Sequence, residues 1–149
     1  MRMTTGLRKK AAAVAATTAL LVGGGVAAAT QASAGYACGA GYHCVYWGNL
    51  GDSGGHDFYN SDTNFTDDYF NDNSPEPGTG AVVNDNVSSA SNSSTGGYES
   101  HYYRDINYGG GLLFCVNPGS EVFMGGLADW QRDSASSLQL RPSTTIKCF

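Results

Sequence analysis

A serine within a protease-like string is the first feature of this chain with catalytic potential. Gly51-Asp52-Ser53-Gly54-Gly55 matches the sequence around the nucleophile of chymotrypsin-like proteases. That chemistry also needs a histidine and an aspartate that precede the serine by long stretches of two barrels. His43 is the sole histidine before Ser53, so the scaffold for a catalytic triad is missing. We therefore interpret the string as a glycine-rich hairpin turn.

The other residues suited to acid–base or metal chemistry are scattered along the chain. His43, His56 and His101 do not form the His-Glu-x-x-His spacing of a zinc protease. Asp57 and the pair Asp67-Asp68 are the types found in glycosidases, which use two carboxylates. Adjacent aspartates in so acidic a chain are more typical of a solvated face. We therefore expect the protein not to be an enzyme.

The N-terminal segment predicts export. Basic residues come first, an apolar stretch runs from Ala11 to Ala29, and Gln31-Ala32-Ser33-Ala34 supplies a small-x-small cleavage site. A transmembrane anchor is the competing interpretation, because the apolar stretch is long enough to span a bilayer. Its weakly apolar Ala, Thr and Gly composition favours cleavage after Ala34. We expect residues 1–34 to be a signal peptide and residues 35–149 to be one secreted, extracellular domain without membrane attachment.

All four cysteines lie in the exported part and could ligate zinc or form disulfides. Their spacing matches no zinc pattern, and an even count in a small exported domain favours two disulfides. Three pairings are possible. Local closure favours Cys38–Cys44, which leaves Cys115–Cys148. The second bond closes a loop of about 34 residues and contributes roughly 3–4 kcal/mol in the chain-entropy model.

The elements that must position these residues follow from composition. Residues 35–149 keep all 13 acidic residues but four of the eight basic ones, so their formal charge is 4 − 13 = −9. Such a surface repels phosphate backbones, which excludes nucleic-acid binding, and suits a metal ion or a cationic partner. Glycine, serine, asparagine, aspartate and tyrosine are abundant, whereas helix formers are scarce. This composition predicts short strands joined by many turns.

An internal repeat divides the domain. Residues 46–58 align without gaps with residues 102–114 at an offset of 56 residues, and an alternative register pairs Asn49 with Asn107. Each copy predicts a strand, a glycine-rich fold-back and a second strand. The identical pairs are Tyr46/Tyr102, Gly54/Gly110, Gly55/Gly111 and Phe58/Phe114.

A second match follows each copy. Asn84-Asp85-Asn86-Val87-Ser88-Ser89 matches Arg132-Asp133-Ser134-Ala135-Ser136-Ser137 at an offset of 48 residues, so the first unit holds about eight extra residues, placed at 71–80. Leu138 and Leu140 then alternate with polar neighbours, as in a strand with one buried face. We predict an all-β sandwich of two Greek-key motifs, motif one at about 41–95 and motif two at about 96–149.

These motifs resemble the βγ-crystallin fold, in which each unit carries an aromatic residue, a glycine-rich fold-back and a later Asn/Asp-Asn/Asp-x-x-Ser/Thr-Ser sequence. Residues 84–89 fit that form fully, and residues 132–137 depart from it at Arg132. Within the fold, the chain most resembles bacterial secreted inhibitors of thermolysin-like metalloproteinases. That similarity rests on the N-terminal cysteine pair before an aromatic strand, on residues 103–110 and 114–119, and on the Asp-Ser-Ala-Ser-Ser stretch.

The resemblance implies a position for inhibition. The inhibitory bond of the family resembles a Cys-Val pair beside a disulfide, and Cys115-Val116 matches it in motif two. The expectation is a rigid outer loop, held by the disulfide and Pro118, that enters a protease cleft with little loss of order. The departure is that the expected partner of Cys115 is the distant Cys148. Val116 as an ordinary strand residue is the alternative.

The resemblance also implies calcium binding by the Asn/Asp-rich loops. Asp85, the backbone carbonyl of Asn86 and Ser88 would supply oxygen ligands, and Asp133 and Ser136 would come from the other motif. Arg132 places a cation where the pattern has a neutral or acidic side chain, which weakens a site that depends on that position. The alternative is that these side chains close turns.

Three hypotheses therefore stand. The first is a monomeric proteinase inhibitor that requires no cofactor and has a secreted, thermolysin-like protease as its partner. The second is a non-inhibitory βγ-crystallin module that is stabilised by calcium or binds a cell-envelope component. The third is a small antimicrobial toxin of similar fold.

Overall fold

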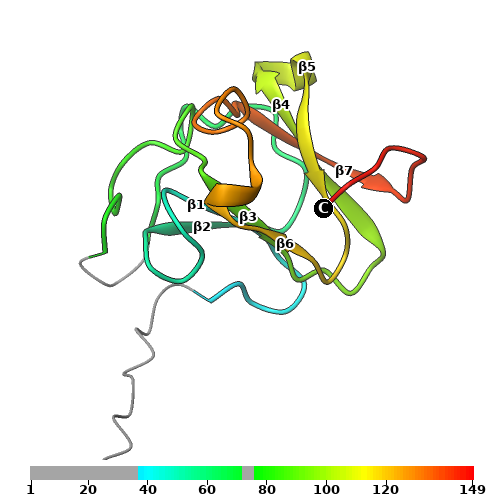
Figure 1. Cartoon of the computed structure of the whole chain (residues 1–149), viewed down its shortest axis with the longest axis horizontal. Coiled ribbons are helices and arrows are strands. Elements are labelled where there is room, and N and C mark those ends of the chain that lie inside the picture. Colours follow the sequence, from blue (N-terminus) through cyan, green and yellow to red (C-terminus); the bar gives the residue numbers. More distant parts are fainter. Residues whose placement is uncertain (1–36, 72–75) are drawn as a thin grey trace, which may run out of the picture.

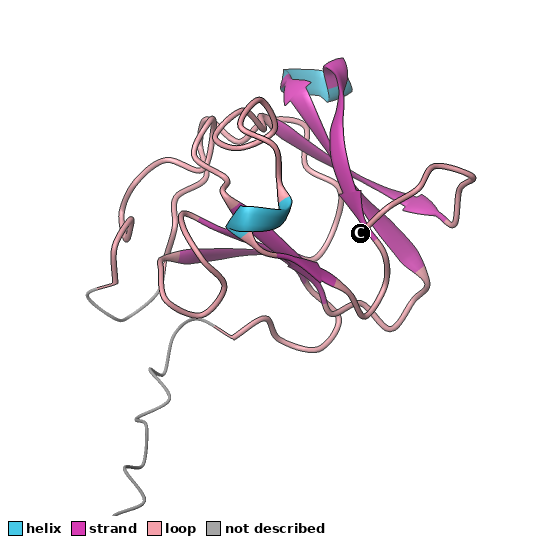
Figure 2. Cartoon of the chain, viewed as in Figure 1, coloured by secondary structure: helices cyan, strands magenta, loops and turns pink. Residues whose placement is uncertain are grey.

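The computed structural model describes residues 37–71 and 76–149, so the predicted signal peptide lies outside the described residues. Within them the regular structure is β-strands and two short 3-10 helices, joined by long loops (Figure 2), and no helix there is long and apolar enough to span a membrane. The all-β prediction is confirmed. The elements are β1 (His43–Tyr46), β2 (Gly55–Phe58), β3 (Ser89–Asn92), β4 (Tyr98–Asp105), η1 (Ile106–Tyr108), β5 (Gly109–Val116), β6 (Glu121–Val122), η2 (Met124–Gly126) and β7 (Ser137–Pro142).

The strands form two antiparallel sheets, ordered β2-β1-β3-β6 and β5-β4-β7, whose strands run in different directions in Figure 1. Each sheet takes a segment from the opposite motif. β6 belongs to motif two but pairs with β3, through Ala90 and Val122. In return, Asp62 of motif one forms an isolated bridge with Leu138 of β7. This exchange is the Greek-key sandwich that the sequence predicts.

The two motifs correspond at a different offset from the one that the sequence alignment indicates. Tyr46 lies opposite the first residue of β3, and Tyr103 lies opposite the first residue of β7. The equivalent strand positions are therefore 57 residues apart, one more than the alignment. A shift of one residue exchanges the two faces of a strand. Val45 thus corresponds to Tyr102, and both are fully buried between the sheets.

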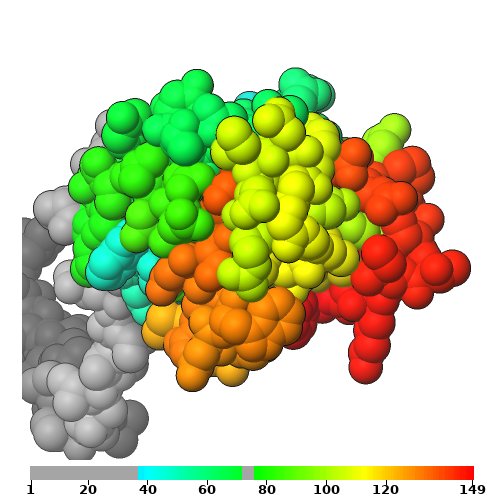
Figure 3. All heavy atoms as spheres, turned by 90° about the horizontal axis from the view of Figure 1, so that it is seen from above, coloured from blue at the N-terminus to red at the C-terminus, as the bar shows by residue number. Residues whose placement is uncertain are grey.

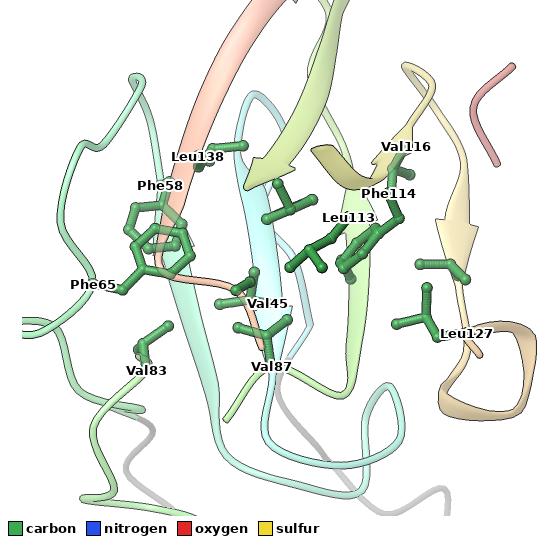
Figure 4. Packing of buried hydrophobic residues seen from close by; sticks show 14 of the residues in the cluster. Val45, Phe58, Phe65, Val83, Val87, Leu113, Phe114, Val116, Leu127 and Leu138 are labelled. Atoms are coloured by element: carbon green, nitrogen blue, oxygen red, sulfur yellow. The ribbon is translucent and has the colours of Figure 1, made fainter. Parts of the chain in front are cut away.

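The core lies between the two sheets and beneath the loops that precede β3 and β7 (Figure 4). Two aromatic pairs are stacked in it. The Phe58 and Phe65 ring centroids are 4.8 Å apart, and those of Tyr102 and Phe114 are 4.6 Å apart. Offset-stacked aromatic pairs stabilise a core beyond the area that they bury. The two motifs thus contribute one stacked pair each.

Both predicted disulfides are confirmed. Cys38 and Cys44 are joined with an S–S distance of 2.01 Å, and Cys115 and Cys148 with one of 2.02 Å. The first bond ties the segment before β1 to that strand, and the second ties the C-terminal segment to β5. The cysteines are therefore cross-links at the two ends of the described domain, and their thiols are not available to a zinc ion.

A buried carboxylate also holds the C-terminal segment. Glu99 and His101 lie on the same face of β4, and both side chains are almost fully buried. Glu99 accepts hydrogen bonds from His101 Nε2 at 2.7 Å, from the Thr144 hydroxyl at 2.8 Å and from the Thr144 backbone N–H at 2.9 Å. Burial, the largest influence, raises the pKa of Glu99, but these hydrogen bonds together outweigh it and lower the pKa to about 2.

The lowered pKa predicts how acid destabilises the fold. Ionised Glu99 is the hydrogen-bonded form, so its contribution is complete above the ordinary carboxyl pKa of 4.5 and is lost as the pH falls toward 2. We expect Glu99→Gln to lower the free energy of unfolding by about 2 kcal/mol at neutral pH, with the difference vanishing in strong acid. Denaturant unfolding across this range measures it. Glu121→Gln, an exposed control, should have little effect; equal losses in the two variants would contradict this role of Glu99.

Candidate functional site

The two Asp-containing loops lie side by side, as the sequence repeat suggests. The backbone N–H of Asp85 donates to the Ala135 carbonyl at 3.0 Å, and the N–H of Asp133 donates to the Val87 carbonyl at 2.9 Å. These bonds are reciprocal, since the four residues are related by the offset of 48. In the space-filling view, green atoms of the first loop region adjoin orange atoms of the second on one face (Figure 3). The pair of loops is thus one structural unit.

The side chains of this unit cross between the motifs. Ser88 Oγ donates to Asp133 Oδ1 at 2.6 Å, and Ser136 Oγ lies 3.4 Å from Asp85 Oδ1 as its donor. The sequence prediction groups the candidate ligands within each motif. The structure instead places each carboxylate beside the hydroxyl of the other motif. The result is two oxygen pairs, one at each of the two loops.

Both aspartates have left-handed backbone conformations. The φ angle is 57° at Asp85 and 50° at Asp133. Asp and Asn tolerate this region better than most residues, because their short side chains bond locally. The side chains of both aspartates are exposed at the surface, while the serines beside them are buried. The carboxylate is therefore the solvent-exposed member of each oxygen pair and is accessible to an ion from solution.

The second serine of each motif has a different task. Ser89 Oγ donates to the Gly48 carbonyl, and Ser137 Oγ donates to the Asp105 carbonyl at 2.8 Å and accepts the Tyr108 N–H at 3.1 Å. Both serines thus close the fold-back hairpin of their own motif. In each Ser-Ser dipeptide, the second hydroxyl therefore closes a hairpin, whereas the first lies beside the aspartate of the other motif.

Motif one offers oxygens that motif two lacks. Asn84 Nδ2 donates to Asp85 Oδ2 at 2.8 Å, and Asn84 Oδ1 is buried without a hydrogen-bond partner. Burial of an unpaired acceptor is costly, so this oxygen, which has no partner among residues 37–71 and 76–149, is available to a ligand. Arg132 occupies the equivalent position in motif two and pairs with the carboxylate of Asp129. The site next to Asp85 is consequently the richer in acceptors.

The side chain of Asn86 organises the first loop. Asn86 Nδ2 donates to the Val82 carbonyl at 3.1 Å and to the Asn84 carbonyl at 3.0 Å. Its amide is therefore used within the turn, which is the structural role that the sequence leaves open. The backbone carbonyl of Asn86, the atom proposed as a ligand, accepts no hydrogen bond within 37–71 and 76–149.

The proposed inhibitory dipeptide lies in a different environment from the one expected. Cys115 is 2% exposed and Val116 is fully buried, and both belong to β5, opposite His101 and Ser100 of β4. A substrate-like bond must be extended and accessible to enter a protease cleft. The expected rigid outer loop at Cys115-Val116 is therefore wrong in its position, and Val116 is the strand residue of the alternative interpretation.

The protease-like string is a turn, as its glycines predict. Ser53 is buried, accepts the Gly48 N–H at 2.8 Å and donates to the Asn49 carbonyl at 3.0 Å. Its hydroxyl is therefore fully engaged in holding the β1–β2 hairpin. The nearest analogue of a base–serine pair, His43 Nδ1 and Ser100 Oγ at 2.6 Å, is buried in the sandwich.

Solved structures of known fold are similar to this chain. A chain from a study titled "Evolution of the eye lens beta-gamma-crystallin domain fold" is 15% identical with a TM-score of 0.52, over 73% of this chain and 94% of that chain. A βγ-crystallin from an archaeon is 22% identical with a TM-score of 0.43, over 69% and 100%. No family model and no curated protein matches the sequence. The βγ-crystallin-like fold is thereby confirmed, while the resemblance to metalloproteinase inhibitors gains no support.

The hairpin-closing role of Ser137 is testable. Ser137→Ala would remove the hydrogen bonds of its buried hydroxyl to the Asp105 carbonyl and the Tyr108 N–H, and we expect the free energy of unfolding to fall by about 1.5 kcal/mol. Ser120→Ala removes a partly exposed hydroxyl in the turn before β6 and should change it by less than about 0.5 kcal/mol. Chemical denaturation followed by tyrosine fluorescence compares them. If both variants lose the same stability, the hydroxyl of Ser137 has no special role.

Proposed function

We propose that this protein is a secreted, non-catalytic module of the βγ-crystallin type that binds calcium between its two motifs. The observation that carries the proposal is the crosswise pairing of Asp85 with Ser136 and of Asp133 with Ser88. Each pair brings a carboxylate and a hydroxyl together from chain segments about 50 residues apart. A cation bound there would link the motifs directly.

The atoms present suit a hard cation. Calcium takes six to eight oxygen ligands from carboxylates, carbonyls, side-chain amides and water in flexible geometry. Asp85, Ser136, the unpaired Oδ1 of Asn84 and the carbonyl of Asn86 are oxygens of these kinds in the first loop region. Asp133 and Ser88 provide a smaller set at the second. Water would complete either shell.

The charge of the domain favours the same ligand. A formal charge of −9 over residues 35–149 creates self-repulsion that a bound dication reduces. Binding to the folded state alone also adds to stability, by about 2.7 kcal/mol at a free concentration one hundred times the dissociation constant. Calcium would thus act chiefly as a stabiliser of a small and highly charged domain.

The two sites should differ in affinity. Arg132 replaces the amide oxygen that Asn84 provides in motif one, and its positive charge lies beside the Asp133 loop. Asp129 pairs with Arg132 and reduces the repulsion without restoring the missing acceptor. We therefore assign the stronger site to Asp85 and Ser136.

The first test is thermal unfolding with and without calcium. We expect saturating calcium to raise the Tm of residues 35–149 by roughly 10 °C, because it binds the folded state. Asp85→Ala should abolish most of the shift, and Asp133→Ala should have a smaller effect. Asp67→Ala is the control, since Asp67 is exposed and outside both loops. Isothermal titration calorimetry of the same variants gives the two affinities.

The outcomes separate cleanly. An unchanged Tm with no heat of binding at millimolar calcium would contradict the proposal. Equal loss in Asp67→Ala would show that general surface charge, and not a site, is responsible. Arg132→Asn offers a gain-of-function arm, because it restores an amide at the deficient position. It should tighten binding at the Asp133 site, and the double variant Asp133→Ala, Arg132→Asn should not gain.

Proteinase inhibition and microbial toxicity have no comparable observation behind them. Inhibition by the Cys115-Val116 bond requires access to a segment that is buried in β5. We expect a thermolysin-like protease to keep full activity in the presence of a molar excess of the folded, calcium-loaded domain. A peptide-hydrolysis assay measures this, with phosphoramidon as the positive control. Stoichiometric loss of protease activity would restore the inhibitor hypothesis at another surface.

A further inference from the structure

An open pocket of about 440 Å³ lies at the boundary of the two motifs. The calcium loops adjoin the start of β3 at Ser89, whereas the pocket is lined by Ser94, just beyond the other end of that strand. The pocket is therefore remote from the calcium loops along β3. Its volume falls in the range of small-molecule sites. None of the contacts described above uses it as a binding surface.

The described residues that line the pocket carry no acidic or basic charge. Its most buried residue is His43, and burial lowers the pKa of that imidazole to about 4, so the ring is neutral at neutral pH. The recess is thus uncharged, although the domain as a whole has a formal charge of −9. The acidic surroundings repel anions, and the recess itself has no carboxylate to hold a cation. The lining therefore suits a neutral ligand.

Two exposed tyrosines line the pocket, and each ring contacts a neighbouring residue. Tyr59 is 66% exposed and makes an edge-to-face contact with Tyr42 at 5.6 Å between ring centroids. Tyr98 is 46% exposed, and its ring packs so closely on Gly96 that an added Cβ there would lie 3.3 Å from it. Tyrosine rings present flat apolar surfaces and have only two side-chain torsions to order on binding. Such surfaces match the C–H faces of pyranose rings.

Two serine hydroxyls that line the pocket beside the tyrosines have hydrogen-bonding capacity that the protein does not fully use. Ser61 Oγ accepts a backbone N–H at 2.9 Å, which leaves its O–H to donate. Ser94 Oγ donates to the Tyr98 carbonyl at 3.3 Å, which leaves its lone pairs to accept. His43, whose Nδ1 is engaged with Ser100, is 2% exposed and forms a neutral part of the wall. A ligand with both donors and acceptors would satisfy the two serine hydroxyls.

We propose that this pocket binds a neutral saccharide built of hexose or N-acetylhexosamine units. A sugar ring has an apolar C–H face, which can pack on the tyrosine rings, and hydroxyls at its edge, which can hydrogen-bond to the serine hydroxyls. An apolar peptide side chain would cover the tyrosines but leave the serine hydroxyls unpaired, which lowers its affinity. The inference does not depend on calcium binding, because none of the pocket residues belongs to the two Asp loops.

The test is direct binding of neutral oligosaccharides. Chitotriose, cellotriose, maltotriose and mannotriose are titrated into residues 35–149 and followed by calorimetry and by NMR saturation transfer. We expect saturable binding of at least one of them. Tyr59→Ala and Tyr98→Ala should each weaken it roughly tenfold, whereas Tyr59→Phe should retain most of the affinity. Tyr69→Ala is the matched control, since Tyr69 is 48% exposed but does not line the pocket.

Three results would overturn the proposal. The first is no binding of any of the four sugars at millimolar concentration. The second is a failure of the variants to discriminate. Affinity would then be unchanged in both Tyr59→Ala and Tyr98→Ala with intact circular dichroism spectra, or Tyr69→Ala would lose as much affinity as they do. The third is binding of a charged probe such as polygalacturonate with none of the neutral sugars. Because Tyr59 and Tyr98 are exposed, their substitution should leave the fold intact, and Tyr59→Phe tests the ring without removing it.

Discussion

Exchange between the motifs is the constraint on which the rest of the structure depends. β6 of motif two completes the sheet of motif one, and Asp62 of motif one bridges to β7 in return. Neither motif can therefore form its full sheet alone. The same exchange brings the Asp85 and Asp133 loops together, where reciprocal backbone hydrogen bonds join them. A binding site formed there exists only in the folded sandwich, so a ligand bound to it would stabilise the folded state.

A domain of this size with few aliphatic side chains needs other sources of order. Hydroxyls provide much of it: Ser89 and Ser137 close the hairpins, and Thr144 anchors the C-terminal segment to Glu99. The two disulfides restrain both ends of the described chain. These local bonds reduce the number of open conformations without a large core. They also leave the surface free to carry a high negative charge, which a bound dication can offset.

Much of this fold could be predicted from local signals. The scarcity of helix formers and the cysteine spacing suffice for an all-β fold and the disulfide pairing, and the Asp-x-x-Ser-Ser repeat predicts the paired loops. The offset of 56 fails by one residue at β1 and β4, because the pairings with β3 and β7 make Tyr46 equivalent to Tyr103 and not to Tyr102. The sequence leaves open whether Cys115-Val116 lies in an outer loop or in a strand. The answer depends on whether this segment pairs with β4, and that pairing is set by the tertiary fold. The crosswise Ser-to-Asp contacts and the Tyr59–Tyr98 pocket depend equally on the tertiary fold.

The two candidate sites lie along one rigid element and should act independently. β3 runs from the Ser88 hydroxyl of the calcium loops to the edge of the pocket, and its last residue, Asn92, is anchored by hydrogen bonds to the Tyr98 and Val116 carbonyls. Coupling between sites requires an element with two arrangements that both ligands bias. A short strand that is paired on both sides and pinned at its end has one arrangement. On the two proposals, calcium would therefore set how much folded domain is present, and the pocket would set which saccharide that domain binds.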